Sequence, residues 1–229
     1  MKRETQFIGL MFLICTLVFT SCESGKTKSL KELAPTPAEQ EKAALLKQLD
    51  RKFEDPEGHY KLGKLYQADG LWSQAEHEYT IALSFDPVHR QAQAARVKVL
   101  QDSGDKATSE FSAEFYMNQA SINAESSLRL AMAFQKEMLD EYAMACYRRA
   151  LRLAPNSAKI HRQMGYYYLS KGDRDRAQDY LSRSFQLDPH QPEVAGELGR
   201  LGVPVRIPRK TRTSTKKLDK IVEQSDKTN

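Results

Sequence analysis

The side chains most able to do chemistry in this 229-residue chain are its five histidines and three cysteines. The histidines show no metal-ligand spacing, and His77-Glu78 lacks a second histidine four residues after the first. No motif of the forms G-x-x-x-x-G-K-[ST], G-x-G-x-x-G or G-x-S-x-G is present, so phosphate, dinucleotide and acyl-transfer sites are not indicated. We therefore predict no enzyme activity, no metal site and no cofactor. The histidines are His59, His77, His89, His161 and His190.

Of the cysteines, Cys22 stands directly after an N-terminal apolar segment. Lys2 and Arg3 give the chain a positive start, and residues 7–19 (FIGLMFLICTLVF) then carry no charge. An uncharged run of this length matches the apolar region of a signal peptide and is shorter than the ~20 residues that span a membrane as a helix. The order of these segments predicts that the protein is exported.

The sequence Phe19-Thr20-Ser21-Cys22 resembles the lipobox of bacterial lipoproteins, in which an apolar residue and two small residues precede a cysteine that is acylated. The family usually has Leu where this chain has Phe19. The resemblance implies that residues 1–21 are a lipoprotein signal peptide and that Cys22 becomes a lipidated N-terminus, anchored in the membrane by acyl chains such as palmitate. Glu23 implies an outer-membrane location facing the periplasm, since Asp in that place favours the inner membrane. An uncleaved anchor and an ordinary signal peptide cut nearby are the alternatives.

The remaining cysteine is expected to be inert. Cys15 would leave with the signal peptide and Cys22 would be blocked by lipid, so Cys146 has no partner for an internal disulfide. We expect a buried structural thiol at Cys146, because a reactive thiol needs a depressed pKa.

A repeated pattern predicts the elements that position these residues. His59-x2-Leu62-Gly63-x2-Tyr66 is followed by Ala75-x3-Tyr79-x2-Ala82 and by Pro87. This resembles the tetratricopeptide repeat, a 34-residue unit in which a large residue, Leu-Gly, Tyr, Ala, an aromatic residue, Ala and Pro occupy set places; His59 stands where the family prefers Trp. The resemblance implies two helices per unit, whose apolar faces are buried when neighbouring units stack. His59 and His161 share one place of the repeat and are expected to pack inside their hairpins.

The pattern recurs every 34 residues. Steps of 34 from Pro56 reach Arg90, Ala124, Ala158 and Pro192, and the motif is repeated in phase at Leu130-Ala131, Met164-Gly165 and Leu198-Gly199. We predict an all-α fold, a tetratricopeptide helix-turn-helix solenoid wound as a right-handed superhelix, with units at 56–89, 90–123, 124–157 and 158–191.

The unit at 90–123 departs from the pattern. Ser109 and Ala113 replace the Ala and the aromatic residue of the second helix, while the length keeps the phase. We interpret it as a degenerate repeat. The alternative is a loop-like insertion in which Phe111, Phe115 and Met117 form an edge facing a partner, although core packing is commoner for such residues.

The flanks of the repeats are predicted to be a tether, two caps and a tail. Residues 22–36 are polar and would form a flexible tether from the lipid. Thr36-Pro37-Ala38-Glu39 has the form of a capping box, which predicts a capping helix at 37–55. Residues 192–202 would be the matching C-terminal cap.

The tail at 203–229 accounts for the positive charge of the chain. It holds eight basic and three acidic residues, an excess equal to the formal net charge of +5, so the rest of the chain is close to neutral. This distribution argues against a nucleic-acid partner. We expect a disordered tail. Two alternatives stay open: contact of its basic residues with anionic lipid or cell wall, and docking of a short stripe (Leu218, Ile221, Val222) on the solenoid.

Binding is the predicted activity. In the tetratricopeptide fold the first helices line a concave groove, and the resemblance implies that their second, fifth, ninth, twelfth and thirteenth places face it. A peptide or helix of a partner protein would lie there, with apolar side chains providing energy and polar ones the register. The candidate groove residues are Tyr60, Lys64, Gln67, Lys98, Gln101, Leu128, Met132, Gln135, Lys159, Arg162 and Tyr166.

These features favour a lipid-anchored scaffold of the cell envelope that binds a protein partner. Small lipoproteins of this architecture resemble the pilotins, which help secretins of pili and secretion systems reach the outer membrane. The alternative is a regulator of envelope or peptidoglycan enzymes that contacts the cell wall.

Overall fold

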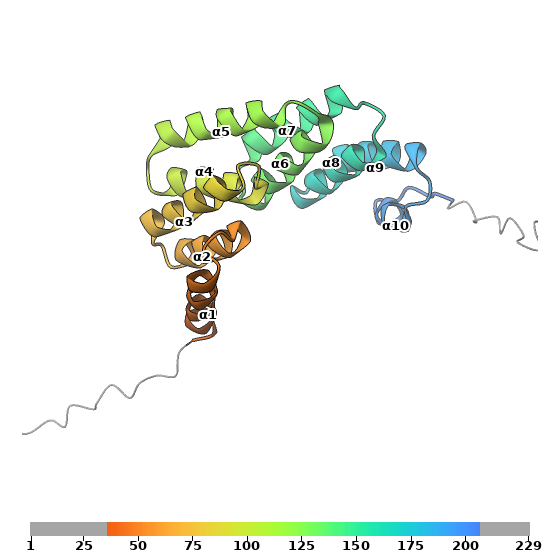
Figure 1. Cartoon of the computed structure of the whole chain (residues 1–229). Helices are drawn as coiled ribbons and strands as arrows, with labels where there is room; N and C mark the ends of the chain where they lie inside the picture. Colours follow the sequence, from red (N-terminus) through yellow and green to blue (C-terminus); the bar gives the residue numbers. More distant parts are fainter. Residues whose placement is uncertain (1–35, 207–229) are drawn as a thin grey trace, which may run out of the picture. The chain divides into compact units, whose positions relative to one another are not determined.

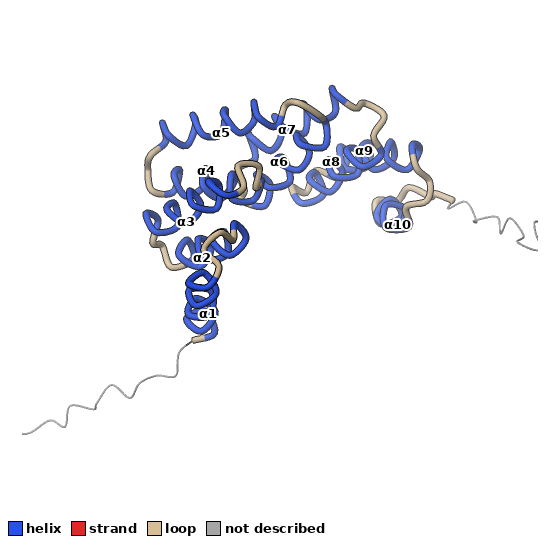
Figure 2. The backbone as a smooth tube through the Cα atoms, in the orientation of Figure 1, coloured by secondary structure: helices blue, strands red, loops and turns tan. Residues whose placement is uncertain are grey.

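The computed structural model describes residues 36–206, which contain ten helices and no strand (Figure 1, Figure 2). The chain divides into a compact unit ending at Gln40 and a second that begins at Glu41 and contains all the paired helices. The signal peptide, Cys22, the tether before Thr36 and the tail beyond Arg206 lie outside the described residues. The helices are α1 (Pro37–Arg51), α2 (Pro56–Ala68), α3 (Trp72–Phe85), α4 (Arg90–Asp102), α5 (Lys106–Ala120), α6 (Ala124–Lys136), α7 (Asp140–Leu153), α8 (Ala158–Ser170), α9 (Arg174–Leu187) and α10 (Pro192–Arg200).

The helices pair as four successive hairpins, α2–α3, α4–α5, α6–α7 and α8–α9, followed by α10. The first helices start at the five positions that the 34-residue step predicts, from Pro56 to Pro192. The predicted all-α fold of helix-turn-helix repeats is confirmed. Residues 90–123 fold as a hairpin of two helices, α4 and α5, and not as a loop.

The starts of the helices follow from capping side chains. Asp105, Asn123 and Asp173 each accept a hydrogen bond from the backbone N–H three residues later, at 3.1, 2.7 and 3.1 Å. The predicted capping box is also present, since Thr36 Oγ1 accepts from the Glu39 N–H at 3.2 Å. α1 ends at Arg51, short of the predicted residue 55, because the next helix begins at Pro56 and the chain turns between them.

The two helices of a hairpin pack closely where a small residue of the first helix contacts a large residue of the second. A Cβ atom at Gly63 would lie 2.5 Å from the ring of Tyr79, and one at Gly165 would lie 2.6 Å from the side chain of Leu181. Tyr79 and Leu181 are fully buried. The absence of a Cβ therefore lets the two helices of these hairpins, α2–α3 and α8–α9, approach closely, and the large side chain fills the space between them.

In the second hairpin the larger of the two residues at the crossing lies on the first helix and the smaller one on the second helix. Val97 stands at the place of Gly63, and Ala113 stands at the place of Tyr79; both are fully buried. Tyr116 takes the place that Ala82 has in the first hairpin, where the second helix meets the next repeat. The Tyr116 hydroxyl accepts a hydrogen bond from Arg96 of α4 at 3.2 Å, so the ring reaches toward α4, and the α4–α5 pair is more open than the other three hairpins.

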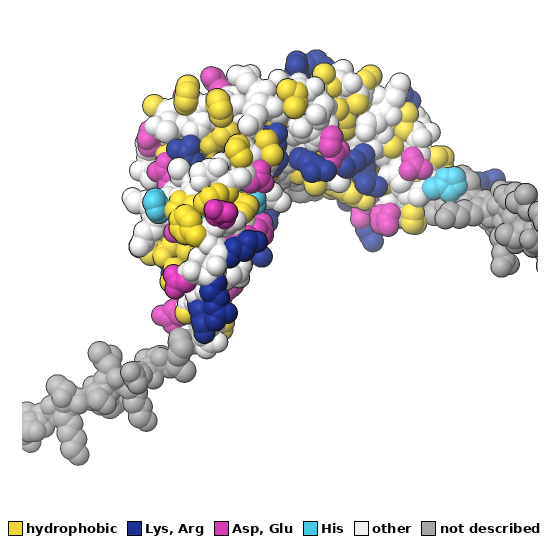
Figure 3. All heavy atoms as spheres, in the orientation of Figure 1, with side chains coloured by type: hydrophobic (Ala, Val, Ile, Leu, Met, Phe, Trp, Pro, Cys, Tyr) yellow, Lys and Arg dark blue, Asp and Glu magenta, His cyan; other side chains and the backbone are white. Residues whose placement is uncertain are grey.

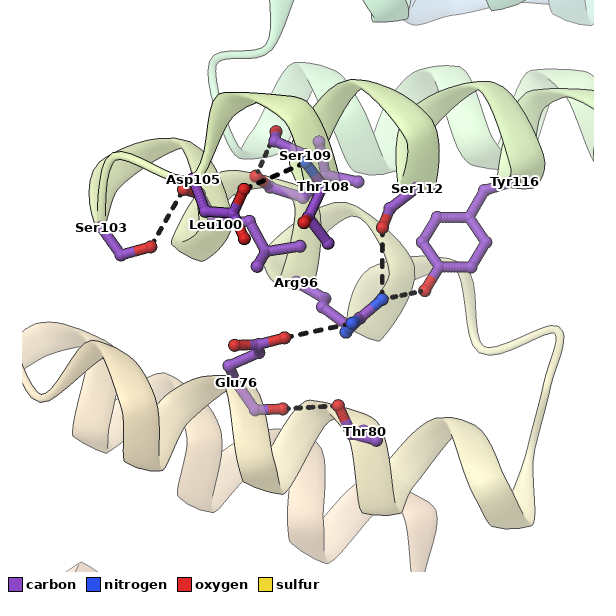
Figure 4. A network of polar contacts seen from close by, with 11 residues as sticks. Glu76, Thr80, Arg96, Leu100, Ser103, Asp105, Thr108, Ser109, Ser112 and Tyr116 are labelled. Atoms are coloured by element: carbon purple, nitrogen blue, oxygen red, sulfur yellow. Dashed lines mark hydrogen bonds and ion pairs between the residues drawn. The ribbon is translucent and has the colours of Figure 1, made fainter.

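A polar network replaces apolar packing in this open hairpin (Figure 4). Arg96 stands where the other units have Leu62, Leu130 and Met164. Its guanidinium donates to Glu76 of α3 at 3.0 Å, to Ser112 of α5 at 3.3 Å and to Tyr116 of α5 at 3.2 Å. Arg96 thus links the three helices α3, α4 and α5.

The turns inside the hairpins require a left-handed backbone at one place of each unit. Gly70, Gly104 and Gly172 occupy it with φ of 73°, 93° and 76°. Met138 stands at the same place of the third unit, with φ of 59°. The left-handed conformation is free of strain for glycine and costly for other L residues.

The close crossing yields a stability prediction. Gly63→Ala places a methyl group against the buried ring of Tyr79, so we expect the free energy of unfolding to fall by about 1–3 kcal/mol in denaturant titrations. The matched control is Gly196→Ala in α10, where an added Cβ meets no atom within 4 Å. That variant should gain roughly 0.5–1 kcal/mol from helix propensity. Equal effects of the two substitutions would contradict the packing argument.

Candidate functional site

The first helices α2, α4, α6 and α8 carry the predicted groove residues, and we call their shared side the first-helix face. The structure divides these residues into buried ones, ones that link neighbouring helices, and exposed ones. Only the exposed side chains are available to a partner without rearrangement. Sorting them therefore locates the part of the face that can bind.

Two of the predicted residues are buried in the core and are not accessible to a partner in this structure. Leu128 is 1% exposed and packs with the α6–α7 core. Tyr60 is 7% exposed and lies with Tyr79 in the core of the first hairpins. Burial, together with the nearby carboxylates of Glu137 and Glu57, raises the pKa of Tyr60 to about 12. Leu128 lies on α6, against which α4 packs closely, and the Tyr60 ring packs against Tyr79 and His89.

Two predicted glutamines stabilise their own hairpins. The Tyr79 hydroxyl donates to Gln67 Oε1 at 2.6 Å, and 68 residues later the Tyr147 hydroxyl donates to Gln135 Oε1 at 2.5 Å. Burial raises the pKa of both tyrosines, so the hydroxyls stay protonated and donate. In the fourth hairpin Leu169 and Leu181 take these two places, and an apolar contact replaces the hydrogen bond.

Lys64 links the first and third hairpins. Its Nζ lies 3.0 Å from both carboxylate oxygens of Glu137, the residue after α6, which is 6% exposed. Lys64 also donates to Gln67 at 3.2 Å. A carboxylate with so little access to water needs this cation, so Lys64 is held in place by the fold.

Other predicted cations are similarly engaged. Lys159 of α8 lies 2.9 Å from Glu125 of α6, and Arg162 of α8 donates to Gln191 at 3.2 Å. Lys98 pairs with Asp102 along α4 at 2.5 Å. Tyr166 is half-buried against the core formed by α9 and α10, and Gln101 is exposed at the end of α4. Of these contacts, the Lys159–Glu125 ion pair connects two successive first helices, α6 and α8, at the surface.

Met132 is the predicted residue that lies in a hollow of this face. The hollow has a volume of about 580 Å³ and lies between the start of α4 and the exposed side of α6. We call it the α4–α6 hollow. Met132 and Val88 are 41% and 53% exposed, and Lys136 is exposed at the rim. Its lining residues are Asp86, Val88, His89, Arg90, Gln91, Arg129, Met132, Ala133 and Lys136.

Hydrogen bonds fix the wall of this hollow on the α4 side. His89 Nδ1 accepts from the Ala92 N–H at 3.2 Å and so caps α4, which leaves Nε2 to donate to Glu57 at 3.1 Å in the neutral ring. Arg90 is 9% exposed and donates to Gln93 at 2.8 Å and Gln119 at 2.9 Å. The hollow therefore has rigid polar walls and a mobile apolar floor, since a methionine side chain adapts its shape readily.

Sequence reasoning missed Val88, His89 and Arg129. Val88 and His89 lie in the turn between two units, outside the groove places of the repeat, and Arg129 lies at the sixth place of its unit. The feature that could have pointed to this site is Val88, an exposed apolar residue between Pro87 and the capping His89. Which turn residues reach the next first helix depends on how closely α4 and α6 pack, and this distance is not written in the repeat pattern.

The nucleophilic and metal-binding side chains hold no reactive cluster. Within residues 36–206, no group of three or more His, Cys, Asp and Glu side chains could hold a metal ion. His59 is 2% exposed and its ring nitrogens contact Glu78 at 2.7 Å and the Phe53 carbonyl at 2.8 Å. His161, at the same place of the fourth unit, is also buried. Both rings pack inside their hairpins, as the repeat predicts.

Cys146 is buried on α7. Burial raises the pKa of its thiol to about 12, and the positive charge of Arg90 only partly opposes this. The thiol is therefore protonated at neutral pH and is not a nucleophile.

The comparisons with known proteins agree with the observed repeats. Residues 158–191, the fourth unit, match the family model of the tetratricopeptide repeat. The described hairpins have the tetratricopeptide-repeat architecture. No curated protein matches the sequence. Between Thr36 and Arg206, no helix is long and apolar enough to cross a bilayer.

Several solved structures resemble the chain in fold. A MamA structure is 16% identical over 70% of this chain and 99% of its own, with a TM-score of 0.36. PilF of Pseudomonas aeruginosa is 24% identical over 64% of this chain and 67% of its own, with a TM-score of 0.37. YrrB, described as a TPR protein with an unusual peptide-binding site, is 18% identical over 69% of this chain and 81% of its own, with a TM-score of 0.36.

The burial of Cys146 gives a prediction for its reactivity. In a chain with Cys15→Ser and Cys22→Ser, an aromatic disulfide reagent should label Cys146 in the folded protein far more slowly than in denaturant at pH 8. A thiol pKa of about 12 leaves a thiolate population on the order of a thousandfold below that of an ordinary cysteine. The labelling rate should then rise about tenfold per pH unit between pH 8 and 10. Fast, pH-independent labelling of the native chain would contradict a buried thiol.

Proposed function

We propose that this protein is a non-catalytic scaffold that binds a polypeptide partner on its first-helix face. The tetratricopeptide architecture supports a protein or peptide partner, because stacked hairpins leave one side of each first helix uncovered. The lining of the α4–α6 hollow is the observation that carries the proposal. It combines two exposed apolar side chains with fixed polar walls.

The composition of the α4–α6 hollow fits a peptide side chain. Val88 and Met132 offer apolar area that a partner would remove from water, at about 25 cal/mol per Å². Arg129 and Lys136 stand at the rim on α6 and can pair with a partner's carboxylates. An apolar anchor beside acidic residues is therefore the partner segment that this part of the face suits.

We further propose that the scaffold is anchored in the cell envelope by lipid on Cys22. The support is the order of a positive start, an uncharged apolar run and the residues Phe19-Thr20-Ser21-Cys22. Anchoring would place the repeats beside the membrane, in reach of envelope complexes such as pili or secretion systems. A periplasm-facing outer-membrane location is the form of this proposal that Glu23 favours.

Site-specific photo-crosslinking tests the binding face. A benzoylphenylalanine in place of Met132 should capture a defined partner in cells, because its side chain lines the α4–α6 hollow. Adding Val88→Asp, which puts a desolvated carboxylate on the apolar floor, should lower the yield of that product roughly tenfold.

The control places the same crosslinker at Gln178, which is exposed on the second helix α9. We expect no product of the same mass from it. Capture of the same partner at Gln178, or capture at Met132 that ignores Val88→Asp, would overturn the assignment of this face.

Metabolic labelling tests the anchor. The chain should incorporate an alkyne-tagged palmitate and stay with the membrane fraction, because at least two acyl chains give stable anchoring. Cys22→Ser should abolish both results, whereas Cys146→Ser should change neither, since that thiol is buried in the fold. Label that persists in the Cys22→Ser chain would exclude lipidation at this residue.

A further inference from the structure

Met138 occupies a backbone position that the other three hairpins reserve for glycine. Its φ is 59°, in the left-handed region, and its side chain is 74% exposed. Gly70, Gly104 and Gly172 stand 34 residues apart at the equivalent places. The third unit thus keeps a costly residue at a turn and holds its apolar side chain out in water, where it gains nothing from folding.

Met138 borders a second hollow, of about 400 Å³, at the edge of the stack where the hairpin turns lie. We call it the turn hollow. It lies between the start of α5 and the α6–α7 turn, and it shares no residue with the α4–α6 hollow. Its lining residues are Gln101, Lys106, Ser109, Glu110, Met138, Leu139, Asp140, Glu141 and Tyr142.

The turn hollow exists because of the open second hairpin. The Arg96 network holds α5 by polar contacts, with Ser112 and Tyr116 of α5 both accepting from Arg96 of α4 (Figure 4), and the α4–α5 pair is more open than the other hairpins. The start of α5 is therefore not closed against the α6–α7 turn. Beyond it on α5, Phe111 and Phe115 are 72% and 56% exposed, and Figure 3 shows hydrophobic side chains standing out along this helix.

The charges around the turn hollow are mainly negative. Glu110, Asp140 and Glu141 line it together with one cation, Lys106. Asp140 already pairs with Lys171 at 2.7 Å. Burial, followed by the negative charges of Glu110, Glu141 and Glu114, raises the pKa of Tyr142 on its wall. Glu110 and Glu141 thus stand around an aromatic ring and a flexible thioether.

We propose that the turn hollow is a second docking site, which takes a basic segment of a partner protein with an apolar residue next to its lysines or arginines. The apolar residue packs against Met138 and the ring of Tyr142, and the cations pair with Glu110 and Glu141. Charge complementarity selects this partner, since an acidic segment would meet three carboxylates. Methionine suits the site because its side chain adapts to different occupants.

A peptide titration tests the proposal directly. The probe is a fluorescein-labelled peptide of sequence GKKLKKLG, and the matched probe is GEELEELG, titrated with the full-length chain in a mild detergent and followed by anisotropy. The basic probe should bind and weaken as salt is added, and the acidic probe should not bind. Binding of both probes alike, or of neither, would overturn the proposal.

Two variants assign binding to the turn hollow. Met138→Gly restores the glycine of the other hairpins, so we expect a higher melting temperature together with roughly tenfold weaker binding of the basic probe. Loss of affinity in a more stable protein cannot arise from misfolding. Glu110→Gln with Glu141→Gln should also weaken binding roughly tenfold and flatten its salt dependence.

The control for the charge change is Asp175→Asn with Glu193→Gln, two exposed acids on α9 and α10. This variant should bind the basic probe as the parent chain does, and so should Val88→Asp in the α4–α6 hollow. Unchanged binding in Met138→Gly, or equal losses in the control, would overturn the site. Failure of crosslinking at Met132 would leave this result untouched, so the two proposals fail separately.

Other occupants of the turn hollow give different outcomes. If the probe binds only after Leu218, Ile221 and Val222 are replaced by Ser in the full-length chain, the chain's own tail is the occupant and the partner proposal is wrong. If the chain forms a dimer in sedimentation experiments that Met138→Gly dissolves, a second copy is the occupant and the proposal is equally wrong. A monomer that binds the basic probe with or without the tail substitutions supports it.

Discussion

The close crossing of two helices inside the hairpins α2–α3, α6–α7 and α8–α9 is the constraint on which this structure depends. Gly63 packs against Tyr79, and Gly165 packs against Leu181, with no room for a Cβ atom at either glycine. Within each pair, the size of one residue therefore depends on the size of the other. The crossing fixes the distance between the first and second helices of a hairpin. The opposite side of the second helix then packs against the next repeat. The constant step of 34 residues between first helices is the visible result.

The second hairpin shows what happens when the pair is exchanged. Val97 and Ala113 keep the volume of the crossing, but Tyr116 and Arg96 bring a ring and a charge to places that are elsewhere small or apolar. The helix α5 is consequently held to α4 by hydrogen bonds, in a hairpin that is more open than the other three. The turn hollow lies beside the start of this helix, whereas the exposed Phe111 and Phe115 stand at places that are largely outward-facing in the other units as well.

The fold could be predicted from the sequence because the residues that define the repeat, such as Leu62, Gly63 and Pro87, act within one hairpin. The binding face could be predicted only in part. Leu128 turned out to be buried because α4 approaches α6 closely, and Lys64 was already engaged because Glu137 lies beside it, 73 residues further along the chain. These distances between repeats depend on the packing of whole hairpins, which no single motif records. Met138 was visible in the sequence as the missing glycine of the step, but its meaning required the backbone angle.

The ion pair between Lys64 and Glu137 has a consequence for cooperativity. In a linear array each repeat touches only its neighbours, so the ends can fray while the middle stays folded. A bond from the first hairpin to the end of α6 skips one unit. Opening the first repeat then leaves an almost fully buried carboxylate without its cation, and the cost is felt in the third repeat. The first three hairpins are in this way joined into one unit of unfolding, while α8, α9 and α10 are coupled to it through contacts between adjacent repeats, such as the Lys159–Glu125 ion pair.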